Sequence, residues 1–138
     1  MNIQELLGNL TEEQRTTGFW YLASPYSKYP KGPDQAMVDV AMTAGELMNV
    51  GLVTVGPITG SHPITKYHGY RGDYEGWRQL DEALISSDKC HGIIVAMLDT
   101  WDQSYGISEE TRFCVEECKK PVWHLTPMPH EVRYDGKD

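Results

Sequence analysis

The 138-residue sequence predicts a single α/β domain with a parallel sheet, and two observations support this prediction. Short apolar runs of strand length alternate with longer segments whose apolar residues recur at helical spacing. Strands and helices in alternation require right-handed crossovers, so the strands should run parallel and helices should cover both faces of the sheet. Hydrophobic residues make up 40% of the chain and charged residues 23%, which is the balance of a globular domain.

The N-terminal part of the chain predicts a helical extension followed by the first strand. Thr11 and Gln14 have the spacing of a capping box, which predicts a short helix within an extension that covers residues 1–17. The apolar and aromatic run at residues 19–23 then predicts a buried strand, which ends at Ser24-Pro25.

The middle of the chain predicts two helices separated by a strand and a long loop. Residues 34–49 carry apolar side chains at helical spacing, and residues 52–55 predict a strand that stops at Gly56-Pro57. Residues 56–73 predict a loop, and a loop of this length in a compact domain is usually functional. Helical spacing returns at residues 74–87.

The C-terminal part of the chain predicts two further strands around one helix. The apolar run at residues 92–98 is the clearest buried strand, and a loop follows it at residues 99–108. Residues 108–120 predict a helix, residues 121–125 predict the last strand, and the tail at 127–138 predicts irregular structure.

Charge and composition exclude several classes of partner. The formal net charge is −8 and no basic run exists, so we expect no nucleic-acid polymer, although one small phosphate at a helix start remains compatible. No apolar run approaches the roughly 18–20 residues that cross a bilayer, so we expect no membrane partner. The N-terminus lacks the pattern of a signal peptide, and three cysteines form no CxxC pair. We therefore expect a cytoplasmic protein.

Ligands of parallel α/β sheets lie outside the carboxyl ends of the strands, where three loops should emerge. The first contains Ser24, Pro25 and Tyr26, whose hydroxyls could bond sugar or phosphate oxygens, although an ordinary turn is the commoner reason for Ser-Pro. The third runs through Gly106 into a helix start, which favours an anion. Simple capping by Ser108 explains that segment equally well.

The sequence also holds carboxyl groups that could do chemistry and side chains of the kinds that bind metals. Glycosyl chemistry requires a pair of carboxyl groups, and besides the glutamates at the start of the last helix the sequence offers Asp81 and Asp88. An acid one turn from Trp77 is often only a surface pair, and Asp88 fits a helix end or strand entry better than a catalyst. The remaining candidates, His62, His68, Cys90, His91, Cys114 and Cys118, match no zinc spacing. We therefore expect no metal, no cofactor and no cysteine nucleophile.

Two motifs resemble the nucleoside 2-deoxyribosyltransferase superfamily. Residues 21–27, Tyr-Leu-Ala-Ser-Pro-Tyr-Ser, are similar to its first strand and turn. Residues 104–110, Ser-Tyr-Gly-Ile-Ser-Glu-Glu, followed by a helix and Lys120-Pro121-Val122, resemble its catalytic segment. The turn at residues 56–58 leading to Ser61-His62-Pro63, with Trp77 and Asp81 later, is similar to a bacterial and phage branch. The resemblance covers residues 18–126.

The resemblance implies a flavodoxin-like, doubly wound sheet of about four to five strands. It also implies cleavage of a nucleoside or nucleotide N-glycosidic bond. In that superfamily a glycine precedes the catalytic glutamate by four positions, so Gly106 implies Glu110 rather than Glu109 as the nucleophile, with Asp81 assisting at the base. The implied substrate contacts are Tyr21, Ser24, Pro25, Tyr26, Ser61, His62, Ser104 and Gly106.

Two departures from the superfamily pattern bear on the reaction. Ser104 stands where transferases often carry aspartate, and a serine there resembles the branch that hydrolyses nucleoside 5'-monophosphates. Hydrolysis is therefore favoured over transfer. The segment Thr111-Arg112-Phe113 replaces the small residues that usually follow the glutamate.

Two other functions remain open on this sequence. The chain could bind a nucleotide without turnover, or it could be an interaction module whose site has decayed. The resemblance also implies a homo-oligomer, most simply a dimer. Trp77 and Trp101 lie in polar segments where a partner could cover them, unless both pack on their own chain as a lid.

Overall fold

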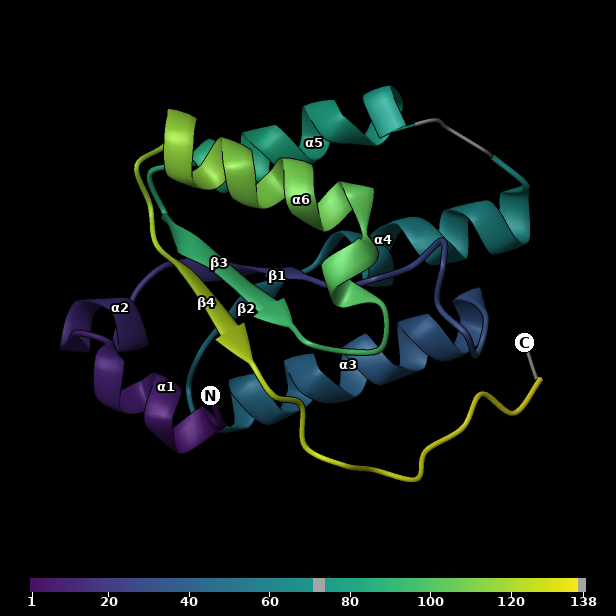
Figure 1. Ribbon diagram of the computed structural model, residues 1–138, viewed down its shortest axis with the longest axis horizontal. Helices are drawn as coiled ribbons and strands as arrows, with labels where there is room; N and C mark the ends of the chain where they lie inside the picture. The colour runs from purple at the N-terminus through teal and green to yellow at the C-terminus, as the bar shows by residue number, and fades with distance from the viewer. Residues whose placement is uncertain (71–73, 137–138) are drawn as a thin grey trace.

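The computed structural model describes residues 1–70 and 74–136, and it contains one four-stranded parallel sheet between two layers of helices (Figure 1). The strand order is β2-β1-β3-β4, with β1 at Phe19–Ala23, β2 at Thr54–Val55, β3 at Cys90–Ala96 and β4 at Val122–Leu125. This confirms the predicted α/β fold, and it is flavodoxin-like. No helix in the described part of the chain is both long and apolar enough to cross a membrane.

Helices occupy most of the chain between the strands. The α-helices are α1 (Ile3–Asn9), α2 (Glu12–Thr16), α3 (Pro33–Asn49), α4 (Pro57–Pro63), α5 (Tyr74–Ser86) and α6 (Tyr105–Arg112). Three shorter turns join them: the π-helical turns η1 (Ile64–His68) and η3 (Phe113–Glu117), and the 3-10 turn η2 (Trp101–Gln103). The predicted capping box of α2 is confirmed, because the Thr11 side chain accepts from the Gln14 amide and Gln14 reaches back to the Thr11 amide.

Each face of the sheet has its own apolar core, because successive strand residues point to opposite faces. Trp20, Leu22 and Ile94 pack on the face covered by α1 and α3, whereas Tyr21 and Ile93 pack on the face covered by α5 and α6 (Figure 1). All of these side chains are essentially buried. The strands are therefore apolar on both faces, as expected of a parallel sheet enclosed by helices.

Gly92 sets the distance between β3 and β4. Its φ is +153°, and a Cβ placed on it would lie 2.3 Å from the carbonyl oxygen of Pro121. Only glycine allows this close approach. The next residue, Ile93, donates its amide to the same carbonyl at 3.0 Å, and the two strands then pair in register from Ile93 opposite Val122.

The loop predicted at residues 56–73 is wrong for most of its length, since α4 and η1 occupy residues 57–68. Pro57 stands at the first helical position, where its missing N–H costs nothing, and Ile58 and His62 lie one turn apart on a buried face. Because glycine and histidine interrupt the apolar pattern of this segment, the sequence did not predict its short amphipathic helix. The predicted loop residues Arg71, Gly72 and Asp73 lie outside the described residues.

The helix predicted at residues 108–120 begins three residues earlier. Ser104, and not Ser108, is its N-cap, because the Ser104 Oγ accepts from the Ile107 amide at 3.2 Å. Glu110 consequently lies in the second helical turn, so the expectation that it sits in the first turn is also wrong.

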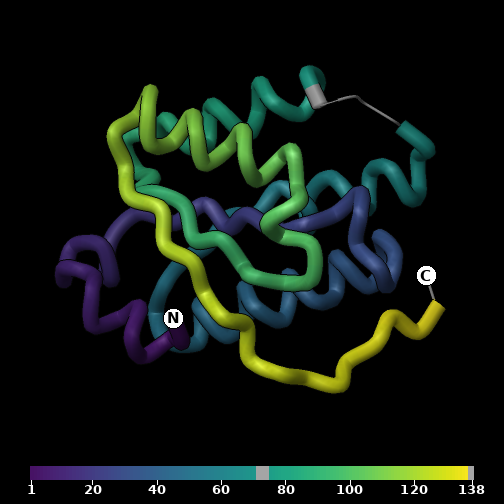
Figure 2. Tube along the Cα trace, in the orientation of Figure 1, coloured from purple at the N-terminus to yellow at the C-terminus, as the bar shows by residue number. Residues whose placement is uncertain are grey.

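The tail after β4 is irregular, as predicted, and is tied to α3. Asp39 on α3 accepts from His130 at 3.0 Å, and Gln35 bonds the Val132 carbonyl at 3.0 Å and the Tyr134 amide at 2.9 Å. Figure 2 shows the tail running beneath the molecule alongside α3.

Candidate active site

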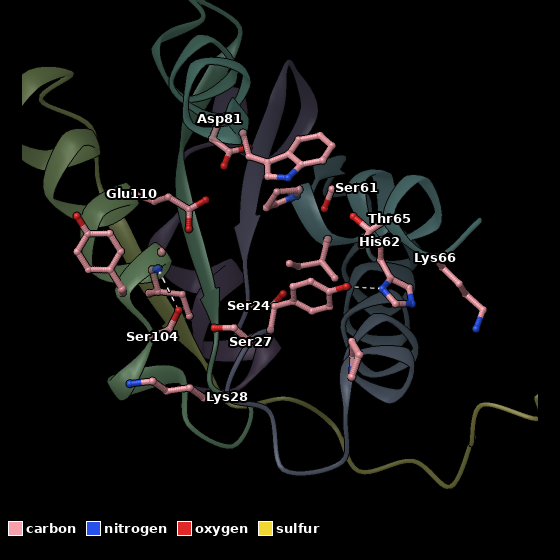
Figure 3. Close-up of a pocket in the computed structure, with 18 of the residues that line it drawn as sticks. Ser24, Ser27, Lys28, Ser61, His62, Thr65, Lys66, Asp81, Ser104 and Glu110 are labelled. Carbon is pink, nitrogen blue, oxygen red and sulfur yellow. Dashed lines mark hydrogen bonds between the residues drawn. The ribbon is translucent and has the colours of Figure 1, made fainter. Parts of the chain in front are cut away.

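A cavity of about 810 Å³ opens at the carboxyl ends of β1 and β3. These two strands adjoin at the point where the strand order reverses, which is where ligands of such sheets bind. Its walls come from the loop after β1, the start of α3, the α4–η1 segment, α5 and the first turns of α6 (Figure 3). The volume is within the range of sites that hold a small organic ligand.

Two carboxyl groups share one tyrosine hydroxyl beside this cavity. Tyr21 points from β1 toward α5 and α6, is fully buried, and its hydroxyl donates to Glu110 Oε2. Asp81, on the inner face of α5, lies near the same hydroxyl and lines the cavity with Glu110. Both carboxyl side chains are largely buried, with 7% exposed in each residue.

Burial raises the pKa of both carboxyl groups. The pKa of Glu110 rises to about 8, because burial disfavours the charged form; the hydrogen bond from Tyr21 opposes this rise and the charge of Asp81 adds to it. The pKa of Asp81 rises to about 6 through burial, again against the effect of Tyr21. The Tyr21 pKa lies well above its usual value, first through burial and then through the charge of Glu110, so Tyr21 is a permanent donor.

The start of α6 forms a second, polar part of the cavity. An added Cβ at Gly106 would lie 3.8 Å from Ser104 Oγ and 3.9 Å from Glu110 Oε1, so this glycine leaves the space between them open. Ser24, at the end of β1, is 7% exposed, and its buried Oγ has no hydrogen-bond partner among the described residues. Figure 3 shows Ser24, Ser27 and Ser104 gathered on one side, with Lys28 beyond them. A buried hydroxyl without a partner is costly unless a ligand bonds it.

A third group of polar side chains forms the wall farthest from Glu110. His62 on α4 is 4% exposed; its Nδ1 lies 2.5 Å from the Tyr26 hydroxyl and its Nε2 lies 2.8 Å from Asp34 Oδ1. Lys66 pairs with the same Asp34 oxygen at 3.3 Å. Figure 3 places His62 and Lys66 across the cavity from Glu110.

Trp77 is the largest side chain that lines the cavity. The ring is half-buried and meets Tyr70 edge to face, with centroids 5.7 Å apart and planes at 83°. With Ile58 and Ile107 it offers a surface on which a flat aromatic ligand can stack.

Eight of the ten residues predicted for the site line the cavity: Ser24, Tyr26, Ser61, His62, Asp81, Ser104, Gly106 and Glu110. Tyr21 lies behind the wall and acts through Glu110 and Asp81, and Pro25 is buried away from the lining. Sequence reasoning missed five polar lining residues: Ser27, Lys28, Asp34, Thr65 and Lys66. A helical reading of residues 57–68 would have placed Thr65 and Lys66 one turn after Ser61 and His62.

No group of three potential metal ligands occurs among residues 1–70 and 74–136. The three cysteines are free thiols; burial raises the pKa of each and takes Cys114 to about 11, which is opposite to the shift of a reactive thiolate.

Comparison with known proteins gives one family. The family described as "Domain of unknown function (DUF1937)" matches residues 18–126, which is most of the chain. No curated protein matches the sequence.

Proposed function

The chain belongs to the DUF1937 family, and we propose that it cleaves the N-glycosidic bond of a nucleoside 5'-monophosphate with Glu110 as the nucleophile. Kinship with the nucleoside 2-deoxyribosyltransferase superfamily forms part of this proposal. The supporting observation is the pair of buried carboxyl groups, Glu110 and Asp81, that share the Tyr21 hydroxyl beside a cavity of nucleotide size.

The placement of this pair beside one cavity suits glycosyl transfer through a covalent intermediate. Retaining glycosidases use two such carboxyl groups, one as the nucleophile and the other as the acid. Groups that titrate near pH 6 and pH 8 hold one proton between them at neutral pH. In the unliganded cavity that proton lies mainly on Glu110, so catalysis requires it to pass to Asp81 when substrate binds, which leaves Glu110 as an ionised nucleophile and Asp81 as an acid.

In the reaction, the Glu110 carboxylate bonds to the anomeric carbon as the bond to the base nitrogen breaks. The electron pair of that bond stays on the base, and Asp81 assists by giving a proton to it. Tyr21 holds the Glu110 carboxyl in place from behind. Water then cleaves the glycosyl ester and restores Glu110.

The polar end of the cavity accommodates a 5'-phosphate in this proposal. The unpartnered Ser24 hydroxyl, Ser104 and the open backbone at Gly106 surround the space at the start of α6, and Lys28 adds a positive charge at its edge. An aspartate at position 104 would repel a phosphate, so the serine favours 5'-monophosphate hydrolysis over nucleoside transfer. Trp77 supplies the stacking surface for the base.

The second candidate is a nucleotide-binding protein without turnover. One observation favours it: with a pKa of about 8, Glu110 is mostly protonated at neutral pH in the unliganded cavity, and a neutral carboxyl is a poor nucleophile. Both candidates predict nucleotide binding, and only catalysis predicts release of free base.

Base release by wild type, Glu110→Gln and Glu109→Gln over nucleosides paired with their 5'-monophosphates tests the proposal. We expect wild type to release base from a monophosphate faster than from its nucleoside. Glu110→Gln should lose at least about 1,000-fold in kcat while still binding, because it keeps its shape and loses the nucleophile. Glu109 is the matched control, since it is paired with Arg112 on the outer face of α6.

The outcomes separate the alternatives. Binding without base release by wild type would establish the second candidate. A Glu110→Gln variant as fast as wild type would remove Glu110 from the chemistry, and loss confined to Glu109→Gln would shift the nucleophile by one residue. Better use of the unphosphorylated nucleosides would refute the phosphate subsite.

We further propose that the protein works as a homo-oligomer in the cytoplasm. Trp101 packs against its own core and its ring lies 5.1 Å from that of His124, so it is partly covered within the chain. The support comes instead from exposed apolar side chains on the elements around the cavity, namely Ile64, Tyr67, Tyr70, Leu80 and Tyr105. Free thiols on all three cysteines fit a reducing compartment.

A further inference from the structure

Three hydrogen-bonded side chains line the cavity wall that faces Glu110. The Tyr26 hydroxyl meets His62 Nδ1 at 2.5 Å, and His62 Nε2 meets Asp34 Oδ1 at 2.8 Å. All three residues line the cavity, and Figure 3 shows the contact of His62 with the tyrosine hydroxyl as a dashed line. A hydroxyl bonded to an imidazole, which a carboxylate orients in turn, is the arrangement of a proton-transfer triad.

Asp34 is held as a carboxylate that fixes the imidazole. The hydrogen bond to His62 lowers the Asp34 pKa, and the nearby Lys66 ammonium lowers it further. Asp34 sits in the first turn of α3, directly after Pro33, so its backbone is also fixed. The His62 ring is thereby held with Nδ1 toward Tyr26.

Tyr26 is the member of the group that presents a protonated oxygen to a ligand. Burial raises its pKa, and the charge of Asp34 raises it further, so the phenol keeps its proton at neutral pH. The residue is only half-buried, lies two positions after Ser24 in the chain, and lines the cavity.

We propose that Tyr26 donates a proton to the departing base, and that His62 and Asp34 position and resupply it. As the bond between the anomeric carbon and the base nitrogen breaks, its electron pair remains on the base and the Tyr26 proton moves to a base nitrogen. The Tyr26 oxygen then takes up a proton across its hydrogen bond with His62 Nδ1. When water later attacks the glycosyl ester, the proton that water releases returns through Tyr26 to His62. This inference rests on the proposed glycosidic cleavage.

The position of this group explains why a second acid would be useful. Asp81 shares Tyr21 with Glu110 and so lies on the nucleophile's side of the cavity. The leaving base departs on the face opposite to the nucleophile, and a purine carries basic nitrogens on more than one edge. One proton reaches the base in each turnover: Tyr26 gives it at the edge that Asp81 does not face, and Asp81 then assists the base through a hydrogen bond. Tyr26 is then a catalytic residue, and His62 and Asp34 are positioning residues.

Dependence on the leaving group tests this role. Wild type, Tyr26→Phe and His62→Gln are compared on 2'-deoxyguanosine 5'-monophosphate and on its N7-methylated form, after subtraction of the enzyme-free rate. On the unmodified nucleotide we expect Tyr26→Phe to lose about 100-fold in kcat. On the methylated nucleotide, whose base is already cationic and leaves without a proton, the loss should be under about fivefold. His62→Gln should show the same contrast more weakly.

Tyr29→Phe is the matched control, because this buried tyrosine bonds Asp39 and does not line the cavity. Tyr29→Phe should change kcat on the two nucleotides by the same factor or leave both values unchanged. Equal losses on the two nucleotides in both Tyr26→Phe and His62→Gln would overturn the inference, since the contacts would then only fasten the loop after β1 to α4. If wild type cleaves neither of these nucleotides, nor any of the nucleosides and 5'-monophosphates used to test the proposed function, then the proposed function itself fails.

Discussion

Glu110 is a buried acid, and its burial has a cost that can be measured without any substrate. Its pKa rises from the ordinary value of 4.5 to about 8 in the folded protein, whereas the unfolded chain keeps the ordinary value. Folding therefore takes up a proton at this site between these pH values. The contribution of Glu110 to stability is best below about pH 4.5 and falls as the pH rises through about 8.

Glu110→Gln should remove this pH dependence. Relative to wild type, we expect the variant to gain on the order of 4 kcal/mol in free energy of unfolding between pH 5 and pH 9, because glutamine carries no ionisable proton. Urea unfolding of both proteins at the two pH values measures the difference. Asp81 titrates in both proteins, so its contribution cancels in the difference between them.

Glu109→Gln again provides the comparison at nearly the same place in the chain. It should follow the wild-type pH dependence, because Glu109 lies on the outer face of α6 beside Arg112. If the free energies of unfolding of wild type and Glu110→Gln change in parallel with pH, then Glu110 is ionised in the folded protein over this pH range.

At the scale of elements, the contact between β3 and β4 depends on one glycine. Gly92→Ala should destabilise the protein by about 3 kcal/mol, because the new methyl would collide with the Pro121 carbonyl oxygen and with the Trp20 ring in a backbone conformation that suits glycine. Chemical denaturation measures the loss.

Gly45→Ala is the control for the same substitution in open space. Gly45 lies exposed within α3 with no atom near its missing Cβ, so alanine should raise the stability by up to about 1 kcal/mol through its helix propensity. If Gly92→Ala leaves the free energy of unfolding unchanged, then β4 can move away from β3 without loss of stability.

The elements with strong patterns could be predicted from the sequence, and those with weak patterns could not. The runs at 19–23 and 92–98 gave β1 and β3 because both strands are buried on both faces and contain almost only apolar residues. The helix over residues 57–68 could not be predicted, because it is short and its buried face holds a histidine. The burial of this histidine depends on Tyr26 and Asp34, which are distant in the sequence.

The candidate site shows the same division. Residues next to strand ends, such as Ser24, could be placed by topology alone, because carboxyl ends of parallel strands meet at one edge. Lys28 and Asp34 could not, since their positions depend on how the loop after β1 folds back onto α4. The sharing of one hydroxyl by Glu110 and Asp81 likewise depends on the packing of α5 and α6 over β1.

At the scale of the whole molecule, we expect a dimer formed through the rim of the cavity. Sedimentation at micromolar concentration should give twice the 15.6 kDa mass of one chain. Tyr67→Glu should shift the protein toward monomer, because it places a charge among the exposed apolar side chains of η1 and α5.

Met48→Glu is the matched control away from the cavity, since Met48 is similarly exposed but lies at the C-terminal end of α3, whereas the cavity is at the N-terminal end of that helix. It should leave the mass unchanged. A monomer mass for wild type that persists with a nucleotide present would defeat the dimer proposal, and an equal effect of both variants would place the contact elsewhere.

The all-parallel order β2-β1-β3-β4 has a consequence for how the chain acquires its site during folding. No strand can pair with the next through a tight hairpin, and the hydrogen bond between Tyr21 and Glu110 joins residues 89 positions apart. Such distant contacts form late and slowly, because large loops must close before they contribute. A chain that has formed its local helices but not the β1–β3 pairing leaves both carboxyl groups in water, at their ordinary acidity. The raised pKa of Glu110 thus exists only once the pairing of β1 with β3 and the packing of α6 have formed.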